Sequence, residues 1–457
     1  MAISVNSVFE VQTGGNDTNG GGFVTGAAGT DYSLVASKRT ATGSNDSTTD
    51  AVAVGTGVIT SVTAAFTSAI VGNIISLSGG TGTLAQGWYQ VTVFTSASSI
   101  TVDRNVAAGT GITMNIGGAL ASPGMAGGVG LVSGNIIYIK AGTYTIASAT
   151  INIATGCFST SLGFIQLEGY QTTRGDLGTA PLLQASGIST FTVITQTGND
   201  AITINLNVDG AALTSSRAFN IRSLGIKLTA QNCTNGGFAV SSEGILQNCI
   251  GTGCSTVAVF VGFTTINCIA YDNTITGFSY TGTKISAIRC IADSNSGAAS
   301  DGFSTGSTDV SLANCISYNN GRDGIRVIDE SVVILNCINE ANVGFGINVN
   351  SRTTTLLTNN ASFNNTAGAV GNATGKGILN LNAVAGSSSF FTNAAGQDFS
   401  LNNTAGAGAA ARAAGFPGVL AIGGTGFLDI GALQHADPAS SGGGARLAGI
   451  GGLASAG

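Results

Sequence analysis

The tetrapeptide Gln-Asn-Cys-Ile at residues 247–250 returns along the chain at a nearly constant spacing. Its copies are Ile-Asn-Cys-Ile at 266–269, Ile-Arg-Cys-Ile at 288–291, Ala-Asn-Cys-Ile at 313–316 and Leu-Asn-Cys-Ile at 335–338. The cysteines lie 19, 22, 25 and 22 residues apart, and residues 359–362 form a sixth copy with Ala361 in the cysteine position. A repeat of this length indicates a solenoid, in which each coil packs on its neighbours.

The repeat continues beyond the cysteine in a fixed order. Asparagine returns five residues after four of these cysteines, Cys254 takes that position in the first repeat, and Asn365 continues the series in the sixth. A glycine and an apolar residue follow, as at Gly302-Phe303. The pattern predicts strand, turn, strand and turn in every repeat. The asparagines of the series are Asn273, Asn295, Asn320, Asn342 and Asn365.

A coil of about 22 residues with recurring asparagine resembles the right-handed parallel β-helix of the pectate-lyase-like superfamily. Coils of that fold stack at the strand spacing of about 4.8 Å, so equivalent side chains form columns. A small thiol fills a narrow interior, and stacked amides hydrogen-bond along their column. The resemblance covers residues 118–435. It implies an interior column of the cysteines Cys249, Cys268, Cys290, Cys315 and Cys337.

The chain divides into four parts by sequence texture. Residues 1–117 contain short β runs without the repeat, which predicts a separate anchoring or assembly module. Residues 118–395 are the expected β-helix. Residues 396–435 resemble the closing segment of the superfamily, which folds over the open end, and residues 436–457 are a Gly/Ala/Ser-rich tail. We therefore predict an all-β chain, a single-stranded right-handed parallel β-helix with an N-terminal β module and a C-terminal cap.

Charged residues are scarce, with 16 basic and 22 acidic residues among 457 and a net charge of −6. The scattered basic residues offer no surface to a phosphate backbone, which excludes nucleic acid as a partner. Amphipathic surface helices are excluded because they need charged faces. No apolar run approaches the roughly 20 residues of a membrane span, and no export signal is visible at the start.

Histidine and cysteine usage limits the chemistry further. The one histidine, His435, excludes a Ser-His-Asp triad, a Cys-His pair and a His-rich metal site. The cysteines recur at coil spacing instead of in the short pairs of a zinc site, so we predict that they are buried and inert. We predict no metal and no cofactor. Residues 174–176, Arg-Gly-Asp, are interpreted as a turn and not as an adhesion motif.

Asp301 and Asp323 are the candidate catalytic residues. Each immediately precedes the glycine of its repeat, so stacking places the two carboxylates within about 5 Å, near the separation found in retaining glycosidases. Asp-Gly is also the common dipeptide of a tight turn, and the sequence favours this structural interpretation. Arg322, Arg326 and Asp329 are neighbours that would form a surface ion network.

Alternation along a strand sends the residues on either side of each cysteine outward. Two outward columns contain the candidate glycan-binding residues Asn267, Asn314, Tyr271 and Tyr318, because amides and aromatic rings suit neutral sugars. A third column is apolar. It consists of Ile250, Ile269, Ile291, Ile316 and Ile338.

Five outward isoleucines would make a larger apolar stripe than a monomer leaves exposed. Either the chain bends at the cysteine so that the isoleucines also point inward, or other copies of the chain cover them. The second alternative predicts a homotrimer about a threefold axis, an architecture that phage tailspikes with parallel β-helices share.

Three classes of function fit these observations. The first is a bacteriophage virion spike that binds instead of cutting, either a tailspike or fibre on the host surface or a spike that decorates the capsid. The sequences at residues 8–24 and 66–91 resemble the openings of β-helix proteins in phage genomes. Such a spike would assemble in the host cytoplasm and contact other virion proteins through residues 1–117 and the C-terminal tail. The alternatives are a polysaccharide lyase or glycoside hydrolase on the same scaffold, and a bacterial surface adhesin.

Overall fold

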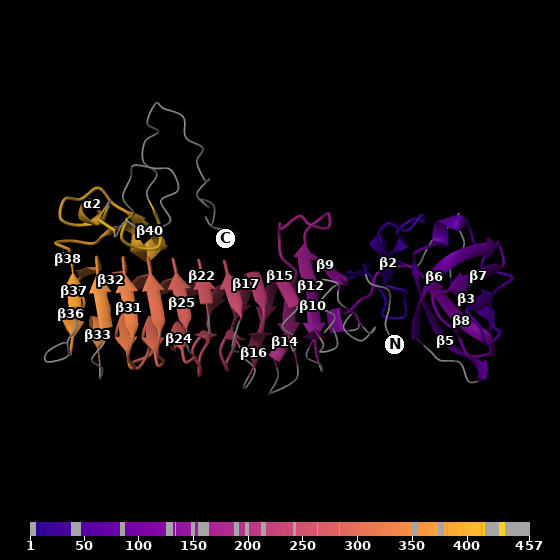
Figure 1. The fold of residues 1–457 in the computed structure, drawn as a ribbon, viewed down its shortest axis with the longest axis horizontal. Coiled ribbons are helices and arrows are strands. Elements are labelled where there is room, and N and C mark those ends of the chain that lie inside the picture. The colour runs from indigo at the N-terminus through magenta and orange to yellow at the C-terminus, as the bar shows by residue number, and fades with distance from the viewer. Residues whose placement is uncertain are drawn as a thin grey trace, which may run out of the picture. The chain divides into compact units, whose positions relative to one another are not determined.

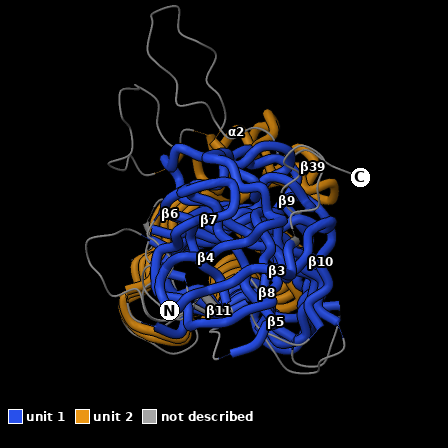
Figure 2. Tube along the Cα trace, turned by 90° about the vertical axis from the view of Figure 1, so that its right-hand side faces the viewer, with its two compact units in different colours: residues 1–282, 294–300 blue, residues 283–293, 301–457 orange. Residues whose placement is uncertain are grey.

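The computed structural model is built almost entirely of β-strands (Figure 1). The chain forms two compact units, one of residues 1–282 and 294–300 and the other of residues 283–293 and 301–457 (Figure 2). Cys157, His435 and the predicted tail lie outside the described residues. The structure describes residues 6–37, 47–82, 87–124, 131–132, 134–147, 151–153, 164–186, 192–196, 201–211, 216–240, 244–262, 264–282, 284–349, 355–372, 379–381, 383–412, 414–415 and 429–434.

A six-stranded barrel closes within the first unit in the order β3-β4-β7-β6-β5-β8. Alternating side chains of its strands fill the interior, where Ile59, Tyr89, Ile100 and Met114 are buried. Two short 3-10 turns, η1 (Tyr32–Leu34) and η2 (Ser68–Ile70), also lie in this part of the chain. The strands are β3 (Ser47–Ala53), β4 (Val58–Thr60), β5 (Ile74–Gly82), β6 (Gly87–Ser96), β7 (Ser99–Val102) and β8 (Gly109–Ile116).

The first residues of the chain connect the barrel to the first coil. β1 (Ser7–Val11) pairs with β2 (Gly22–Val24) in antiparallel fashion and with β9 (Ile136–Lys140) in parallel. Barrel residues Trp88 and Asn115 donate hydrogen bonds to carbonyls of residues 19 and 18. The first strand therefore belongs to the sheet of the coils, and the barrel begins at β3.

The coils of the first unit stack three rows of parallel strands. The first row holds β9, β12 (Ile165–Tyr170), β15 (Ala201–Asp209), β17 (Leu224–Gln231), β19 (Ile245–Gln247) and β22 (Thr264–Ile266). The second adds β10 (Thr143–Ile146), β13 (Leu182–Ala185), β20 (Ile250–Thr252) and β23 (Ile269–Tyr271). The third holds β11 (Ile151–Ile153), β14 (Thr192–Gln196), β16 (Arg217–Ile221), β18 (Phe238–Val240), β21 (Phe260–Val261) and β24 (Phe278–Tyr280).

The coils of the second unit likewise stack three rows of parallel strands. The first row holds β25 (Ile285–Ile288), β28 (Val310–Ala313), β31 (Val332–Leu335), β34 (Thr355–Thr358) and β37 (Leu379–Leu381). The second holds β26 (Ile291–Asp293), β29 (Ile316–Tyr318), β32 (Ile338–Glu340), β35 (Ala361–Phe363) and β38 (Val384–Ala385). The third holds β27 (Phe303–Thr305), β30 (Ile325–Val327), β33 (Phe345–Val349) and β36 (Gly368–Gly371). The prediction of an all-β parallel β-helix is confirmed.

The predicted asparagine column is present inside the coils. In the first unit Asn273 donates its side-chain amide to Oδ1 of Asn295 at 2.8 Å. In the second unit Asn320 donates to Asn342 at 2.9 Å, and Asn342 donates to Asn365 at 2.8 Å. Each amide also donates to a backbone carbonyl of the preceding coil, which satisfies groups that would otherwise be buried without partners.

The cysteines of the described residues are all buried and free of disulfides. Cys249 and Cys268 lie in the interior of the first unit, and Cys290, Cys315 and Cys337 lie in the interior of the second. Burial raises the pKa of the Cys315 thiol well above its ordinary value. A raised pKa keeps this thiol protonated, which disfavours its reactive thiolate form.

Two positions of the repeat differ from the prediction. Ala361 pairs with Ile338, and the backbone N–H of Cys337 donates to Oδ1 of Asn360, so Asn360 and not Ala361 takes the cysteine position of the sixth copy. Cys233, which no repeat explained, is a neighbour of Cys254 in the asparagine column. The tetrapeptide alone could not resolve either register because Asn and Cys both fill the interior columns.

The residue before each cysteine turns the corner between two rows of strands. Asn248, Asn267, Arg289, Asn314 and Asn336 have φ between 53° and 56°, in the left-handed region. Asn tolerates this conformation better than other residues with a side chain. The repeated Asn before Cys is therefore explained by the left-handed backbone conformation of the corner. The alternation of inward and outward side chains begins at the cysteine.

After β38 the chain runs back along the side of the coils of the second unit. This flank segment, residues 386–412 with 429–434, contains β39 (Phe391–Asn393), η3 (Ala394–Gly396), β40 (Asp398–Leu401) and the short helix α2 (Gly408–Ala411). It packs on Phe363, the backbone N–H of Phe390 donates to Oε2 of Glu340, and the backbone N–H of Gly431 donates to the carbonyl of Asn336. The described residues of the segment thus lie on the side of the coils, whereas the sequence predicted a cap over the open end.

Candidate functional site

Asp301 and Asp323 occupy equivalent positions of successive coils in the second unit, as predicted. The backbone N–H of Asp323 donates to Oδ1 of Asp301 at 3.3 Å. Glycines 302, 324 and 346 that follow this position are obligatory, because a β-carbon at Gly302 would lie 2.6 Å from the carbonyl oxygen of Gly324. The pair therefore lies in a tightly packed turn.

Both carboxylates are buried and already bound by other groups of the chain. Asp301 is 0% exposed and accepts a fork of two hydrogen bonds from Arg322, one of them from Nε to Oδ1 at 2.7 Å. Asp323 is 3% exposed and accepts from the N–H of Phe345 at 2.9 Å and from Nδ2 of Asn348 at 2.8 Å. Burial raises the pKa of Asp301, and the Arg322 guanidinium opposes that rise. The arrangement stabilises the turn and offers no open carboxylate to a glycosidic bond.

The isoleucine column points outward, because Cys249 is buried, Ile250 is half-buried and the next residue is buried again. In the first unit Ile250 and Ile269 are both half-buried. In the second unit Ile291, Ile316 and Ile338 are 6%, 0% and 0% exposed.

The flank segment itself covers Ile316 and Ile338 of the second unit. A β-carbon at Gly431 would lie 2.8 Å from Cδ1 of Ile338 and 3.6 Å from Cγ1 of Ile316. The prediction that Ile316 and Ile338 form an interface between copies is therefore wrong, since their own chain buries them. For Ile250 and Ile269 the interface stays a prediction.

The predicted glycan-binding residues also differ between the two units: those of the second unit contact the flank segment, and those of the first are half-buried. Tyr318 packs edge-to-face against Phe391 and Phe399, with ring centroids 6.1 and 5.7 Å apart, and burial raises its pKa. Asn314 donates to the carbonyls of residues 429 and 431. Both side chains hold the flank segment, so the prediction that they bind a glycan is wrong.

Tyr271 and Asn267 lie in the first unit and remain half-buried on its surface. Nδ2 of Asn267 donates to Oδ1 of Asn248 at 3.2 Å, so the two corner asparagines bind each other along their column. The glycan-binding role of this pair stays a prediction.

A buried charge network in the first unit escaped the sequence analysis. Glu10 is 0% exposed and accepts hydrogen bonds from the hydroxyl of Tyr170 and from Nε of Arg174. Arg174 also donates to Asp31 at 2.8 Å and lies over the ring of Tyr138. Burial raises the pKa of Glu10. The hydrogen-bonded partners are more than 140 residues apart in the sequence, so no local pattern could reveal them.

The Arg-Gly-Asp sequence is part of this network and of a turn. Arg174 is bound to the N-terminal residues, and Asp176 accepts the backbone N–H groups of residues 171, 172 and 173. The interpretation as a turn is therefore confirmed, and the arginine is engaged within its own chain.

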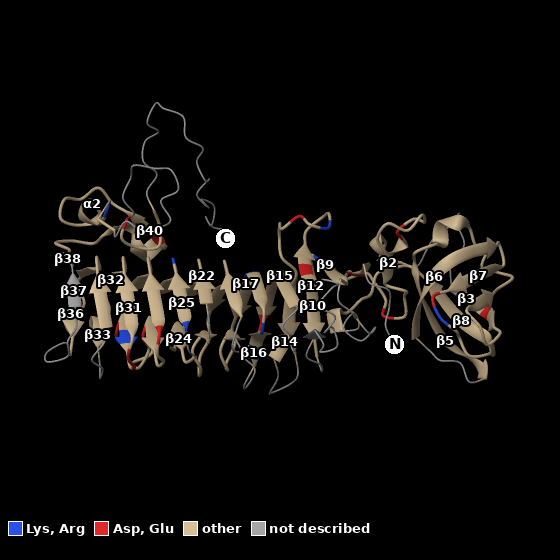
Figure 3. Ribbon diagram, in the orientation of Figure 1, with Lys and Arg blue, Asp and Glu red and all other residues tan. Residues whose placement is uncertain are grey.

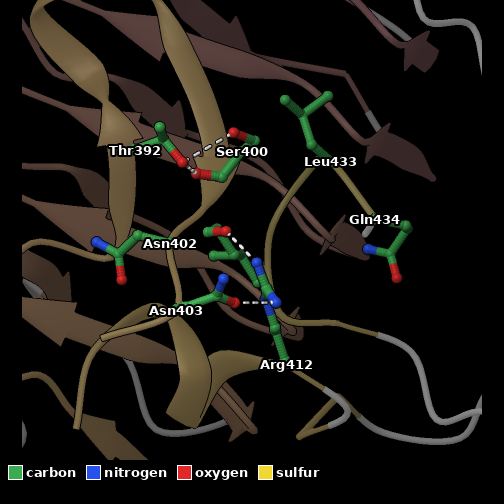
Figure 4. Close-up of a pocket in the computed structure, with 8 residues that line it drawn as sticks. Thr392, Ser400, Asn402, Asn403, Arg412, Leu433 and Gln434 are labelled. Atoms are coloured by element: carbon green, nitrogen blue, oxygen red, sulfur yellow. Dashed lines mark hydrogen bonds between the residues drawn. The ribbon is translucent and has the colours of Figure 1, made fainter. Parts of the chain in front are cut away.

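A polar hollow lies on the flank segment in the second unit (Figure 4). Its volume is about 540 Å³, and no acidic residue is among the residues that line it. Two of its amides are structural. Asn402 binds the N–H groups of residues 404 and 408, and Gln434 binds the backbone of residues 429 and 431. The lining residues are Thr392, Ser400, Leu401, Asn402, Asn403, Arg412, Leu433 and Gln434.

Charged side chains are sparse along the described strands of the coils (Figure 3). Within the described ranges, no cluster of three or more His, Cys, Asp or Glu side chains is arranged to hold a metal ion. The described part of the chain also contains no helix that is long and apolar enough to cross a bilayer.

The strand pairing defines the class of protein: a parallel β-helix joined to a small barrel. No protein-family model matches the sequence, and the curated proteins gave no match. Among solved structures the chain is similar to ORF18 of Geobacillus virus E2, at 14% identity and a TM-score of 0.41, with 55% of this chain and 53% of that one covered. The chain thus spans about half the length of that phage protein.

Two enzymes are also similar in structure. Pectate lyase Pel9A matches at 16% identity and a TM-score of 0.40, over 70% of this chain and 92% of that one. The catalytic unit of a GH87 α-1,3-glucanase from Streptomyces thermodiastaticus matches at 9% identity and a TM-score of 0.35, over 74% and 88%. At these identities the similarity is one of fold alone.

Proposed function

We propose that the chain is a spike of a bacteriophage particle that binds instead of cleaving, as a host-attachment tailspike or as a capsid decoration. It would attach to other virion proteins through the N-terminal module and the C-terminal tail and would act on the outside of the particle. Copies would associate as a homotrimer through the surface around Ile250 and Ile269.

One observation carries the choice of binding over cleavage. The best candidate for an acid pair, Asp301 and Asp323, is buried and fully engaged with Arg322, Asn348 and backbone N–H groups. Cleavage of a glycan requires an acid and a base that reach the scissile bond. Because these carboxylates stabilise a turn, we infer that the coils serve as a rigid scaffold and not as a catalytic surface.

The activity test compares the purified chain with an Asp301→Asn variant on host capsule and exopolysaccharide. We expect neither protein to release reducing ends or unsaturated uronates. Robust cleavage by the unmodified chain that the substitution abolishes would overturn the proposal in favour of the lyase or hydrolase.

The location test is mass spectrometry of purified particles with quantified copy number. We expect the chain in the particle in a copy number divisible by three, low for a tailspike and high for a capsid decoration. Absence from purified particles, with the chain on the bacterial surface, would favour the adhesin instead.

A further inference from the structure

We propose that the polar hollow of the flank segment binds the carboxylate of an acidic sugar, a hexuronic acid residue of a host glycan, through Arg412. This inference rests on the proposed function, because it names the ligand class of a binding spike. It does not concern the Tyr271 column or the carboxylates of the coils.

Arg412 has more donors than the chain uses. A guanidinium carries five N–H donors, and here Nη1 donates to Oδ1 of Asn403 while Nη2 donates to the carbonyl of Leu401. Nε is buried and out of reach of the hollow, but Nη1 and Nη2 each carry a second N–H beyond the one that is bound. A carboxylate accepts from two such guanidinium donors in a matching fork. The two remaining Nη donors therefore favour an oxyanion in the hollow.

The surrounding framework fixes the guanidinium before any ligand arrives. Asn402 links the hairpin to the start of α2, with donated bonds to the carbonyls of residues 389 and 391 and accepted bonds from residues 404 and 408. Figure 4 shows the side chain of Asn403 pointing to the guanidinium of Arg412, and the hydroxyls of Thr392 and Ser400 pointing toward one another. A preorganised site loses less entropy when it binds.

The size and lining of the hollow favour a sugar over a bare ion. A volume of about 540 Å³ lies in the range of small-molecule sites and far exceeds a single oxyanion. The hydroxyl of Thr392 donates to the carbonyl of Ser400, and that of Ser400 donates to Thr392 and to Asp398 Oδ1 at 2.6 Å, so these oxygens can accept from sugar hydroxyls. Leu433, which is 43% exposed, offers an apolar wall to the C–H face of a ring. The residues that line the hollow include no acidic one, and the carboxylate of Asp398 beside it is bound to Ser400.

The test is isothermal titration calorimetry of the full chain with three probes: a trigalacturonate, the matched neutral galactose trisaccharide and inorganic phosphate. We expect binding of the trigalacturonate alone, weakened by added salt. Arg412→Gln should lower the affinity at least tenfold, and Leu433→Trp should do so by filling the hollow without altering a hydrogen bond. The control Arg289→Gln, at an exposed corner of the same unit, should leave the affinity unchanged.

Three results would overturn the inference. Equal binding of the neutral trisaccharide would show that the carboxylate is not recognised. Phosphate binding as tight as that of trigalacturonate would show that the sugar is not recognised. Unchanged affinity in both the Arg412 and Leu433 variants would show that the ligand does not bind in the hollow. If trigalacturonate does not bind but the chain is present in purified particles, only the inference about the hollow is wrong and the proposed function stands. Absence of the chain from particles contradicts the proposed function, whatever the hollow binds.

Discussion

Oδ1 of Asn342 accepts two hydrogen bonds from Asn320 on the preceding coil, from the backbone N–H at 3.1 Å and from the side-chain amide at 2.9 Å. Asn342 in turn donates to Asn365, so one side chain joins three coils. Buried polar groups that lose a partner cost about 1–3 kcal/mol each. We expect Asn342→Ala to lower the free energy of unfolding by about 3 kcal/mol in urea denaturation.

The matched control is Thr366→Ala, an exposed position one residue beyond the column. Surface substitutions of this kind change stability by about 0.5 kcal/mol or less. A similar loss in both variants would contradict the role assigned to the column.

Arg289 is the exception among the corner residues, since Asn occupies the other four left-handed positions before cysteine. The left-handed conformation has a higher steric cost for Arg than for Asn. We expect Arg289→Asn to raise the free energy of unfolding by about 0.5–1 kcal/mol. Arg326→Asn, within the extended strand β30, should not stabilise the chain. Equal effects of the two substitutions in thermal or urea unfolding would refute the backbone explanation.

Ile338 and Ile269 stand at the same position of the repeat but differ in burial. Full burial makes an Ile→Ala change cost about 2–5 kcal/mol. We expect Ile338→Ala to cost about 3 kcal/mol and Ile269→Ala about 1 kcal/mol, measured on the same denaturation curves. An equal and concentration-dependent loss at Ile269 would show that another copy covers it as deeply as the flank segment covers Ile338.

Glu340 makes the attachment of the flank segment sensitive to pH. Its Oε2 accepts the N–H of Phe390 at 3.0 Å, and burial raises its pKa above the ordinary 4.5. The folded chain then holds the proton more tightly than the unfolded chain. This contribution to stability is therefore present below about pH 4.5 and is lost as the pH rises through the folded pKa.

Glu340→Gln keeps an acceptor oxygen and removes the ionisation. We expect the melting temperature of the unmodified chain to fall relative to that of the variant between about pH 4 and 7. Melting temperatures that change in parallel across this range would show that Glu340 contributes nothing to the pH dependence.

The columns could be predicted from the sequence because a solenoid converts a linear repeat into direct stacking. Asn273 and Cys249 lie where the spacing places them, and the glycine step is explained by the close approach of Gly302 to the next coil. The register failed only at Asn360, where two adjacent asparagines fit the same tetrapeptide.

The candidate site was less predictable, because the exposure of its residues depends on contacts with segments outside the repeat. Outward residues such as Tyr318 and Asn314 have the composition of a binding surface, yet Phe399 contacts the former from 81 positions away and Asp429 binds the latter from 115 positions away. The Asn before Cys was interpreted as an outward ligand, although a left-handed corner accounts for it. Arg412 has no sequence signal at all, since its partners are a carbonyl and a single amide.

The backward course of the flank segment changes how the end of this solenoid should come apart. Coils that touch only their neighbours fray one at a time from a free end. Here the flank segment contacts three successive coils, at Phe363, at Glu340, and at Tyr318 with Asn314. A coil between these points cannot open without breaking contacts of the flank segment, so we expect the terminal coils to unfold together when the chain is exposed to proteases or mechanical load.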